Sequence, residues 1–261
     1  MARRVDFGRG AHVYDRRHGA TLPESMARDV VTLAGLAHGS QILEVGAGTG
    51  RVCLTLAALG FRVVGVEPAR AMLDVLGSKD PQKTVRVAVA EGAHLPFADS
   101  CFDAVVLARL LYLLPDWREV LAEVLRVVRP DGRVLHEWGN GASEEPWVQI
   151  REEARRLFEA AGVRAPFHPG VRNEAEVDAF LAERGCKRLG VIRSPGESTL
   201  PLSTFLERIV NGECSYTWDV PDDVLEQCLP QLEAWVSARF DLARAEPIPR
   251  ETQWAIHQVA S

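Results

Sequence analysis

The chain has 261 residues, 47% of them hydrophobic, and carries a formal net charge of −6. This length suits one large α/β domain with an insertion, and the apolar content is sufficient for a substantial core. The acidic balance argues against nucleic-acid binding, which needs basic surface, and no apolar run approaches the ~20 residues of a membrane span. Five cysteines are scattered without a C-x-x-C pair, so we expect free thiols in a cytoplasmic protein and no metal site.

The first 20 residues are polar and include Tyr14-Asp-Arg-Arg-His18. They precede a predicted helix over Leu22–Leu36, with Pro23 and Glu24 in its first turn. Two interpretations of this arm stay open: it is solvated, or it folds over a neighbouring site.

A glycine-rich turn follows a short apolar run. Ile42-Leu-Glu-Val45 is typical of a buried parallel strand, Gly46, Gly48 and Gly50 follow at alternate positions, and residues 52–59 form a predicted helix. Glycine permits backbone angles and close ligand approach that a side chain blocks. The arrangement predicts a nucleotide-type site at the carboxyl end of a sheet, although a tight turn without a ligand has the same pattern.

A second apolar run, residues 61–66, ends at Glu67. An acidic side chain at the tip of the second strand can accept hydrogen bonds from both ribose hydroxyls. The alternative is an exposed charge at a strand end, and the position directly after Val66 favours the ribose role.

Further along, the patterns predict alternating strands and helices. Strands are expected at residues 85–89, 104–108, 133–138, 186–192 and 253–259, and helices at 68–76, 117–128, 147–161 and about 173–183.

The residues of the glycine turn discriminate between two classes of ligand. A dinucleotide site expects G-x-G-x-x-G/A, and Arg51 stands where its small third residue belongs. The stretch instead resembles the first motif of class I S-adenosylmethionine (SAM)-dependent methyltransferases. Four further motifs of that family resemble segments of this chain in the right order: Gly65–Met72, Ala90–Phe97, Phe102–Val106 and Val127–Leu135.

This resemblance covers roughly residues 40–140. It implies a Rossmann-like seven-stranded methyltransferase sheet with helices on both faces and a last antiparallel strand. It also implies methyl transfer from SAM to a small-molecule acceptor, with S-adenosylhomocysteine (SAH) as product. A SAM-binding module without turnover, or an NAD-dependent oxidoreductase, is the alternative.

The resemblance also implies roles for particular residues. Tyr14 and Arg17 would lie over the methionine end of SAM, Met72 on the adenine face, and Glu91 beside the adenine amino group. The cofactor-binding residues expected in this way are Tyr14, Arg17, Glu44, Gly46, Ala47, Gly48, Glu67, Pro68, Met72, Glu91, Gly92, Ala93 and Arg109.

Two residues are candidates for a general base. Tyr112 follows the fourth predicted strand, at a position where many relatives carry a histidine, and His136 lies within the fifth. A structural, buried His136 is the alternative interpretation.

The long segment 193–252 between the last two strands carries two helical apolar patterns. Since a hairpin needs only a few connecting residues, we expect this insertion to form a helical cap over the site. Residues 1–192 and 253–261 would then form the SAM-binding domain, with 1–20 as its arm. Tyr216 and Trp218, between the two patterns, are candidates for the acceptor wall, or they simply pack the cap onto the sheet.

Overall fold

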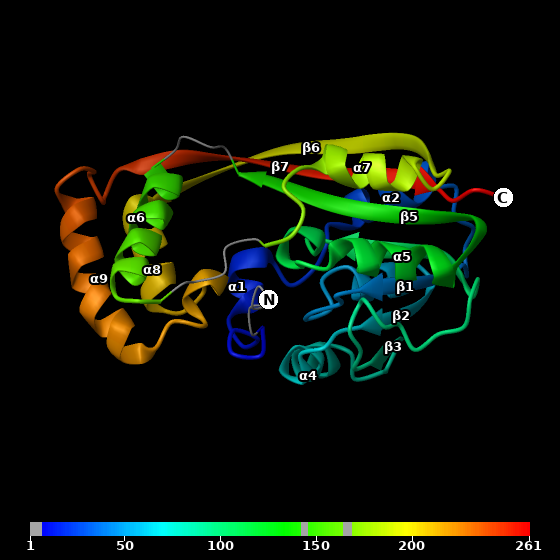
Figure 1. Cartoon of the computed structure of the whole chain (residues 1–261), viewed down its shortest axis with the longest axis horizontal. Coiled ribbons are helices and arrows are strands. Elements are labelled where there is room, and N and C mark those ends of the chain that lie inside the picture. The colour runs from blue at the N-terminus through cyan, green and yellow to red at the C-terminus, as the bar shows by residue number, and fades with distance from the viewer. Residues whose placement is uncertain (1–6, 142–145, 164–168) are drawn as a thin grey trace.

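The computed structural model describes residues 7–141, 146–163 and 169–261, and it is built around one seven-stranded sheet (Figure 1). The strand order is β3-β2-β1-β4-β5-β7-β6, and β7 runs antiparallel to both of its neighbours. This confirms the expected methyltransferase-like sheet. The strands are β1 Gln41–Val45, β2 Arg62–Val66, β3 Val85–Ala88, β4 Phe102–Ala108, β5 Val128–Gly141, β6 Lys187–Pro201 and β7 Ala245–Gln258.

Helices cover both faces of the sheet, and further helices lie beyond its carboxyl edge (Figure 1). They are α1 Tyr14–His18, α2 Glu24–Leu33, α3 Cys53–Ala58, α4 Arg70–Lys79, α5 Trp117–Val127, α6 Pro146–Ala160, α7 Glu174–Ala182, α8 Leu202–Val210 and α9 Asp222–Ser237, with 3-10 turns η1 Leu111–Leu113 and η2 Ser215–Thr217. Within the described ranges, none of these helices combines the length and the apolar character that a bilayer span requires.

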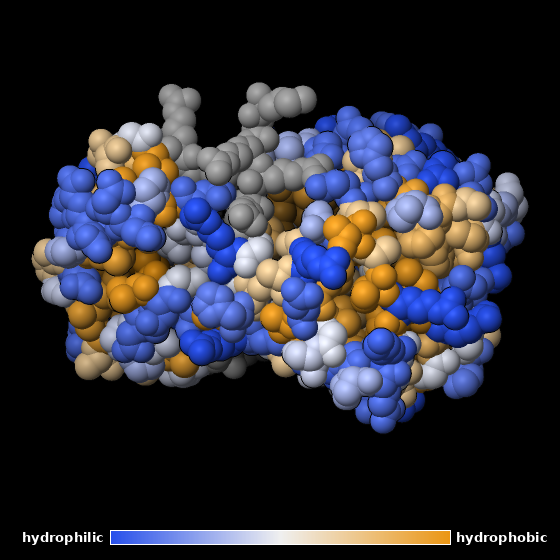
Figure 2. Space-filling model, turned by 90° about the horizontal axis from the view of Figure 1, so that it is seen from below, coloured by the Kyte–Doolittle hydropathy of each residue, from blue (hydrophilic) through white to orange (hydrophobic). Residues whose placement is uncertain are grey.

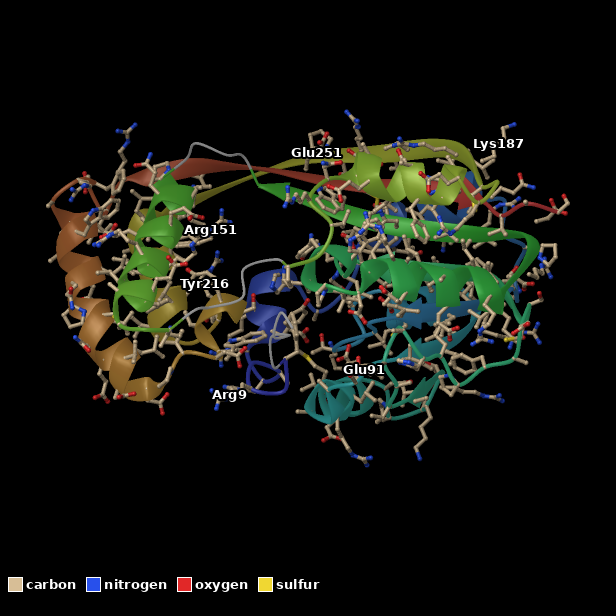
Figure 3. All side chains as sticks on the ribbon, viewed as in Figure 1. Arg9, Glu91, Arg151, Lys187, Tyr216 and Glu251 are labelled. Atoms are coloured by element: carbon tan, nitrogen blue, oxygen red, sulfur yellow. The ribbon has the colours of Figure 1, made fainter. Side chains whose placement is uncertain are left out.

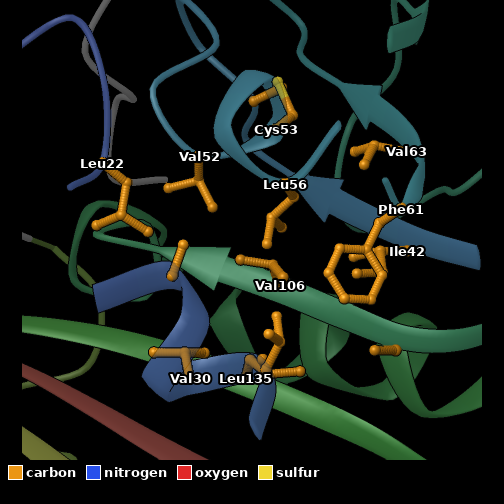
Figure 4. Packing of buried hydrophobic residues seen from close by; sticks show 14 of the residues in the cluster. Leu22, Val30, Ile42, Val52, Cys53, Leu56, Phe61, Val63, Val106 and Leu135 are labelled. Carbon is orange, nitrogen blue, oxygen red and sulfur yellow. The ribbon is translucent and has the colours of Figure 1, made fainter. Parts of the chain in front are cut away.

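Alternation along the strands creates two apolar layers. On one face, Ile42, Val106 and Leu135 pack against α2 and α3 (Figure 4). On the other face, Leu43 and Val105 pack against α5 and α7. Since successive strand residues point to opposite faces, one short run such as β1 supplies both layers and is buried from Ile42 to Val45.

The register of the central strands brings their carboxyl ends to one edge. Val45 pairs with Val66 on one side and with Leu107 on the other, and Ala108 pairs with Glu137. The residues that follow β1, β2 and β4 therefore emerge next to one another, where open α/β sheets bind ligands.

Strands β6 and β7 are longer than the sequence predicted. Pairing continues from Ile192 with Trp254 out to Pro201 with Ala245, and β5 accompanies it as far as the pair Gly141–Arg250, so residues 197–201 and 245–249 form a two-stranded ribbon. The expected helical insertion 193–252 is therefore helical mainly over α8 and α9. The ribbon was missed because backbone pairing does not require the apolar alternation by which strands are recognised.

Helices α6, α8 and α9 form a third apolar cluster, which includes Trp147, Ile150, Phe205, Leu206 and Leu232. Figure 1 shows it at the far end of the ribbon, beyond the carboxyl edge of the sheet, with α1 between the two. We call α6, α8 and α9 the helical cluster. This placement differs from the expected one, in which residues 147–161 belong to the SAM-binding domain, because an apolar stripe does not reveal which surface covers it.

Apolar and charged residues alternate over the molecular surface. Figure 2 shows apolar patches on both the helical cluster and the sheet part of the face seen from below. Val87 and Val89 at the β3 edge are exposed by 45% and 55%. Isolated exposed residues of this kind are ordinary in water-facing proteins.

Candidate functional site

A cavity of about 260 Å³ lies at the carboxyl edge of β1, β2 and β4. Most of the residues expected to bind a cofactor meet in its wall: Tyr14, Gly46, Gly48, Glu67, Pro68, Met72, Glu91, Gly92 and Arg109. Glu44, Ala47 and Ala93 are outside that wall, and the side chain of Arg17 lies outside the described residues. Phe7 and Leu110 complete the wall with further apolar surface.

The glycine turn needs glycine for two different reasons. Gly46 has φ +76°, and a Cβ there would come within 2.8 Å of Leu110. Gly48 has φ +52°, and a Cβ there would meet no protein atom within 4 Å. The first glycine permits close packing, while the second leaves an open cradle that a ligand can approach.

Glu44 links the strand before the glycine turn to the helix after it. Its carboxylate accepts a hydrogen bond from the Cys53 backbone N–H at 2.8 Å, at the start of α3. Burial raises the pKa of Glu44 to about 8, while the nearby Arg51 guanidinium opposes that rise. Glu44 therefore contributes to the shape of the turn rather than to the cavity wall.

Glu67 occupies the tip of β2 and faces the cavity. Its two carboxylate oxygens accept hydrogen bonds from the backbone N–H groups of Gly48 at 3.1 Å and Ala69 at 3.0 Å. Burial raises the pKa of Glu67, and these two hydrogen bonds partly oppose the rise. The carboxylate is thus held in place by the glycine turn and by the start of the next helix.

A buried ion cluster lies behind the cavity wall. Glu137, at the end of β5, has a fully buried side chain that forms ion pairs with both Arg51 and Arg109. Sequence reasoning missed Glu137, because its partners are 86 and 28 positions away and no motif joins them.

The N-terminal arm closes one side of the cavity. Phe7 and Tyr14 line it directly, and burial raises the pKa of Tyr14, with Tyr112 adding to the rise. Asp15 accepts a hydrogen bond from the Thr49 hydroxyl at 2.5 Å and forms an ion pair with Lys79 at 2.7 Å. Asp15 therefore fastens the arm to the glycine turn and to α4, a role that the sequence did not indicate.

Comparisons with known proteins agree with this geometry. The model of a family described as a methyltransferase domain matches residues 43–136. An uncharacterised methyltransferase of Mycobacterium tuberculosis is 32% identical over 195 residues, which span 73% of this chain and 77% of that protein. The chain belongs to the class I SAM-dependent methyltransferases.

More distant relatives extend this result. Nocamycin O-methyltransferase of Saccharothrix syringae is 31% identical over 151 residues, 52% of this chain and 54% of that protein. Among solved structures, a putative methyltransferase from Bacillus halodurans superposes with a TM-score of 0.63 at 14% identity, covering 91% of this chain and all of that one. At that identity the superposition supports the fold. The family match and the Mycobacterium tuberculosis relative confirm the predicted SAM-dependent methyltransferase over the NAD-dependent alternative.

In this methyltransferase, the two candidate bases lie outside the cavity wall. His136 is buried in the sheet beside Trp138, and burial together with the nearby His257 lowers the pKa of His136 to about 3. Tyr112, in η1, packs edge-on against Trp138 with ring centroids 5.8 Å apart. Tyr112 is directly followed by Leu113, which lines the cavity, whereas neither chain neighbour of His136 does.

The two candidate acceptor residues are also buried outside the wall. Tyr216 belongs to the helical cluster, on the side of the arm opposite Glu91 (Figure 3). Trp218 packs edge-on against Phe7, with centroids 5.3 Å apart, and its backbone oxygen accepts a hydrogen bond from Arg9 at 2.6 Å. Trp218 therefore contacts the cavity indirectly, through the arm.

Proposed function

We propose that this methyltransferase methylates a small organic molecule at the cavity on the carboxyl edge of its sheet. The observation that carries the proposal is the arm, which places Phe7 and Tyr14 over the cavity and is fastened by Asp15. Because the arm covers one side of this cavity, an acceptor has to reach the cofactor through a restricted opening, which suits a small molecule better than a polymer chain.

The residues present fit the cofactor. The open cradle at Gly48 gives a ligand access to the backbone, and Glu67 offers a fixed carboxylate to ribose hydroxyls. Met72 and Gly92 line the cavity beside Glu91, which would accept from the adenine amino group. The methionine end would then lie toward Tyr14 and Arg109. The remaining expected contacts, by Arg17, Ala47 and Ala93, stay predictions.

Bound SAM would supply a methyl group already activated for displacement by its sulfonium. The chain's own residues then have to align the acceptor and exclude water, which together are worth ~7–11 kcal/mol of barrier. Phe7, Leu110 and Leu113 provide the apolar surface that excludes water. Tyr112 is the better candidate base, because the low pKa and deep burial of His136 favour a structural role.

The helical cluster is proposed to select the acceptor. The cofactor motifs end before residue 140, and the cluster lies beyond the same sheet edge (Figure 1). The segment 193–252 and α6 would form this cap together, with Tyr216 and Trp218 shaping the acceptor side through the arm. Relatives named as demethylmenaquinone methyltransferase in Renibacterium salmoninarum and as nocamycin O-methyltransferase support a small-molecule acceptor.

Calorimetry with SAM, SAH and NAD tests the cofactor site, and we expect heat from the first two only. Incubation with methyl-labelled SAM and a library of small acceptors, followed by mass spectrometry, tests turnover. SAH binding without any methylated product across phenols, quinones, amines and thiols would favour a binding module without turnover. Labelled product on RNA or protein instead would contradict the small-molecule assignment.

A further inference from the structure

The ion cluster behind the cavity wall contains more positively charged groups than negatively charged ones. One buried carboxylate, Glu137, meets two guanidinium groups: Arg51 from the end of the glycine turn and Arg109 from the end of β4. Among the side chains that the structure describes, no other carboxylate forms an ion pair with either arginine, and a further contact of the Arg109 guanidinium is His18, whose Nδ1 lies 3.5 Å from Nη1. Two guanidinium groups therefore share one carboxylate, and a partly buried excess of positive charge of this kind favours the binding of an anion.

Glu137 holds Arg109 at two points. The Arg109 Nε lies 3.3 Å from one carboxylate oxygen, and the Arg109 backbone N–H donates to the Glu137 carbonyl oxygen at 3.2 Å. Arg51 pairs with the other carboxylate oxygen. The side chain of Arg109 is thus fixed at its base, while a quarter of it remains exposed and it forms part of the cavity wall.

The backbone of Arg109 is itself unusual. Its φ of +52° lies in the left-handed region, which is unfavourable for a residue with a Cβ. Strain of this kind persists where the surroundings impose it, and it is concentrated at binding sites. Here it turns the arginine from the end of β4 toward the ligand rather than along the strand.

The charges along the cavity indicate which part of a ligand Arg109 meets. Glu67 and Glu91 line the part of the wall proposed for ribose and adenine, and they would repel a carboxylate. Arg109 is the wall's cation, with Tyr14 and apolar side chains completing the wall. An amino-acid carboxylate is therefore best placed beside Arg109, whose planar fork matches its two oxygens.

We propose that Glu137 is a positioning residue that holds Arg109 in the cavity wall to bind the methionine carboxylate of the cofactor. This inference rests on the proposed function, because it assumes that the adenosine part lies at Glu67. Glu137 itself need not touch the ligand, and Arg51 pairs with its other carboxylate oxygen from outside the cavity wall.

The test compares two ligands that differ at one end. SAH carries the amino-acid carboxylate, whereas 5′-methylthioadenosine retains the adenosine and sulfur but lacks the amino-acid group. Calorimetry gives dissociation constants of both ligands for the wild type, Glu137→Gln, Arg109→Met and the control Arg51→Met. The control removes the other arginine of the same cluster, which lies outside the wall.

We expect Glu137→Gln and Arg109→Met to weaken SAH binding about tenfold or more and 5′-methylthioadenosine binding less than twofold. Arg51→Met should leave the ratio of the two constants within about twofold. The direction of the change in SAH affinity in Glu137→Gln is informative, because removing the negative charge of Glu137 would by itself strengthen the binding of an anion. Weaker SAH binding in Glu137→Gln therefore reports the lost position of Arg109.

Unchanged or tighter SAH binding in Glu137→Gln, or equal losses for the two ligands in Arg109→Met, would overturn the inference. Circular dichroism melting confirms that each variant is folded, and Glu137→Asp replaces Glu137→Gln if the latter is not, since aspartate is too short to reach both arginines. A wild type that binds neither ligand would instead contradict the proposed function.

Discussion

Replacement of Glu67 by alanine separates cofactor binding from stability. The Glu67 carboxylate is held by backbone N–H groups of Gly48 and Ala69 and lines the cavity, so it is prepared to accept hydrogen bonds from a ribose. A hydrogen bond to a charged group contributes ~1.5–3 kcal/mol, which corresponds to a loss of about 10- to 150-fold in affinity for SAH.

The same substitution has a smaller effect on folding. It removes two backbone-to-carboxylate hydrogen bonds, but it also removes a carboxyl group whose burial raises its pKa and so disfavours its charged form, and we expect a net loss of about 1–3 kcal/mol in the free energy of unfolding. The two N–H groups lie at the cavity and can bind water in place of the carboxylate. The protein should therefore remain folded at 25 °C.

Calorimetric titration with SAH and urea denaturation measure the two quantities on the same preparation. Glu67→Gln should fall between the wild type and alanine, because it keeps an acceptor oxygen but loses the charge. Glu24→Ala is the control, since Glu24 forms only an exposed ion pair with Arg28 on α2. A dissociation constant for SAH that is unchanged in Glu67→Ala would refute the placement of the ribose.

Three further predictions follow from the site. Because the pKa of Glu44 is raised to about 8, the folded protein binds a proton at this carboxyl more tightly than the unfolded chain does. The contribution of Glu44 to the free energy of unfolding is therefore fully present below about pH 4.5 and is lost as pH rises through 8. Urea titrations should show the wild type losing stability relative to Glu44→Gln over that range, by at most ~1.4 kcal/mol per pH unit, and parallel curves would contradict the shift. Asp15→Ala removes the hydrogen bond between the arm and Thr49 and should raise the SAH dissociation rate about three- to tenfold in stopped-flow measurements. Thr49→Ala in the Asp15→Ala background should add little, and additive effects of the two substitutions would show that they do not act through this one contact. Trp218→Phe should loosen the packing on Phe7 and slow methyl transfer, while the affinity for SAH stays within a few-fold of the wild type. A larger loss of SAH affinity than of turnover would show that Trp218 contributes to cofactor binding rather than to acceptor binding.

The sequence by itself determined the features that depend on neighbouring residues. The apolar run of β1 and the glycine turn follow one another directly, so local backbone preferences specify both. The position of Glu67 at the tip of β2 follows from the next apolar run. Parallel pairing then brings the ends of these strands together, which is why most predicted cofactor residues meet in one cavity.

Tertiary structure decided the features that join distant segments. Glu137 meets Arg51 only because β5 and the glycine turn end at the same edge of the sheet, and Asp15 meets Thr49 only because the arm folds back. Tertiary packing likewise buries Tyr216 and Trp218 outside the cavity wall, with Trp218 against Phe7 of the arm.

The extent of the cap also depends on tertiary packing. The apolar stripe of α6 requires some partner surface, and its spacing is equally suited to the sheet or to α8 and α9. The outer halves of β6 and β7 lack apolar alternation and are specified by pairing with each other. Periodicity reports that a residue is covered, whereas the identity of the covering element depends on how the whole chain packs.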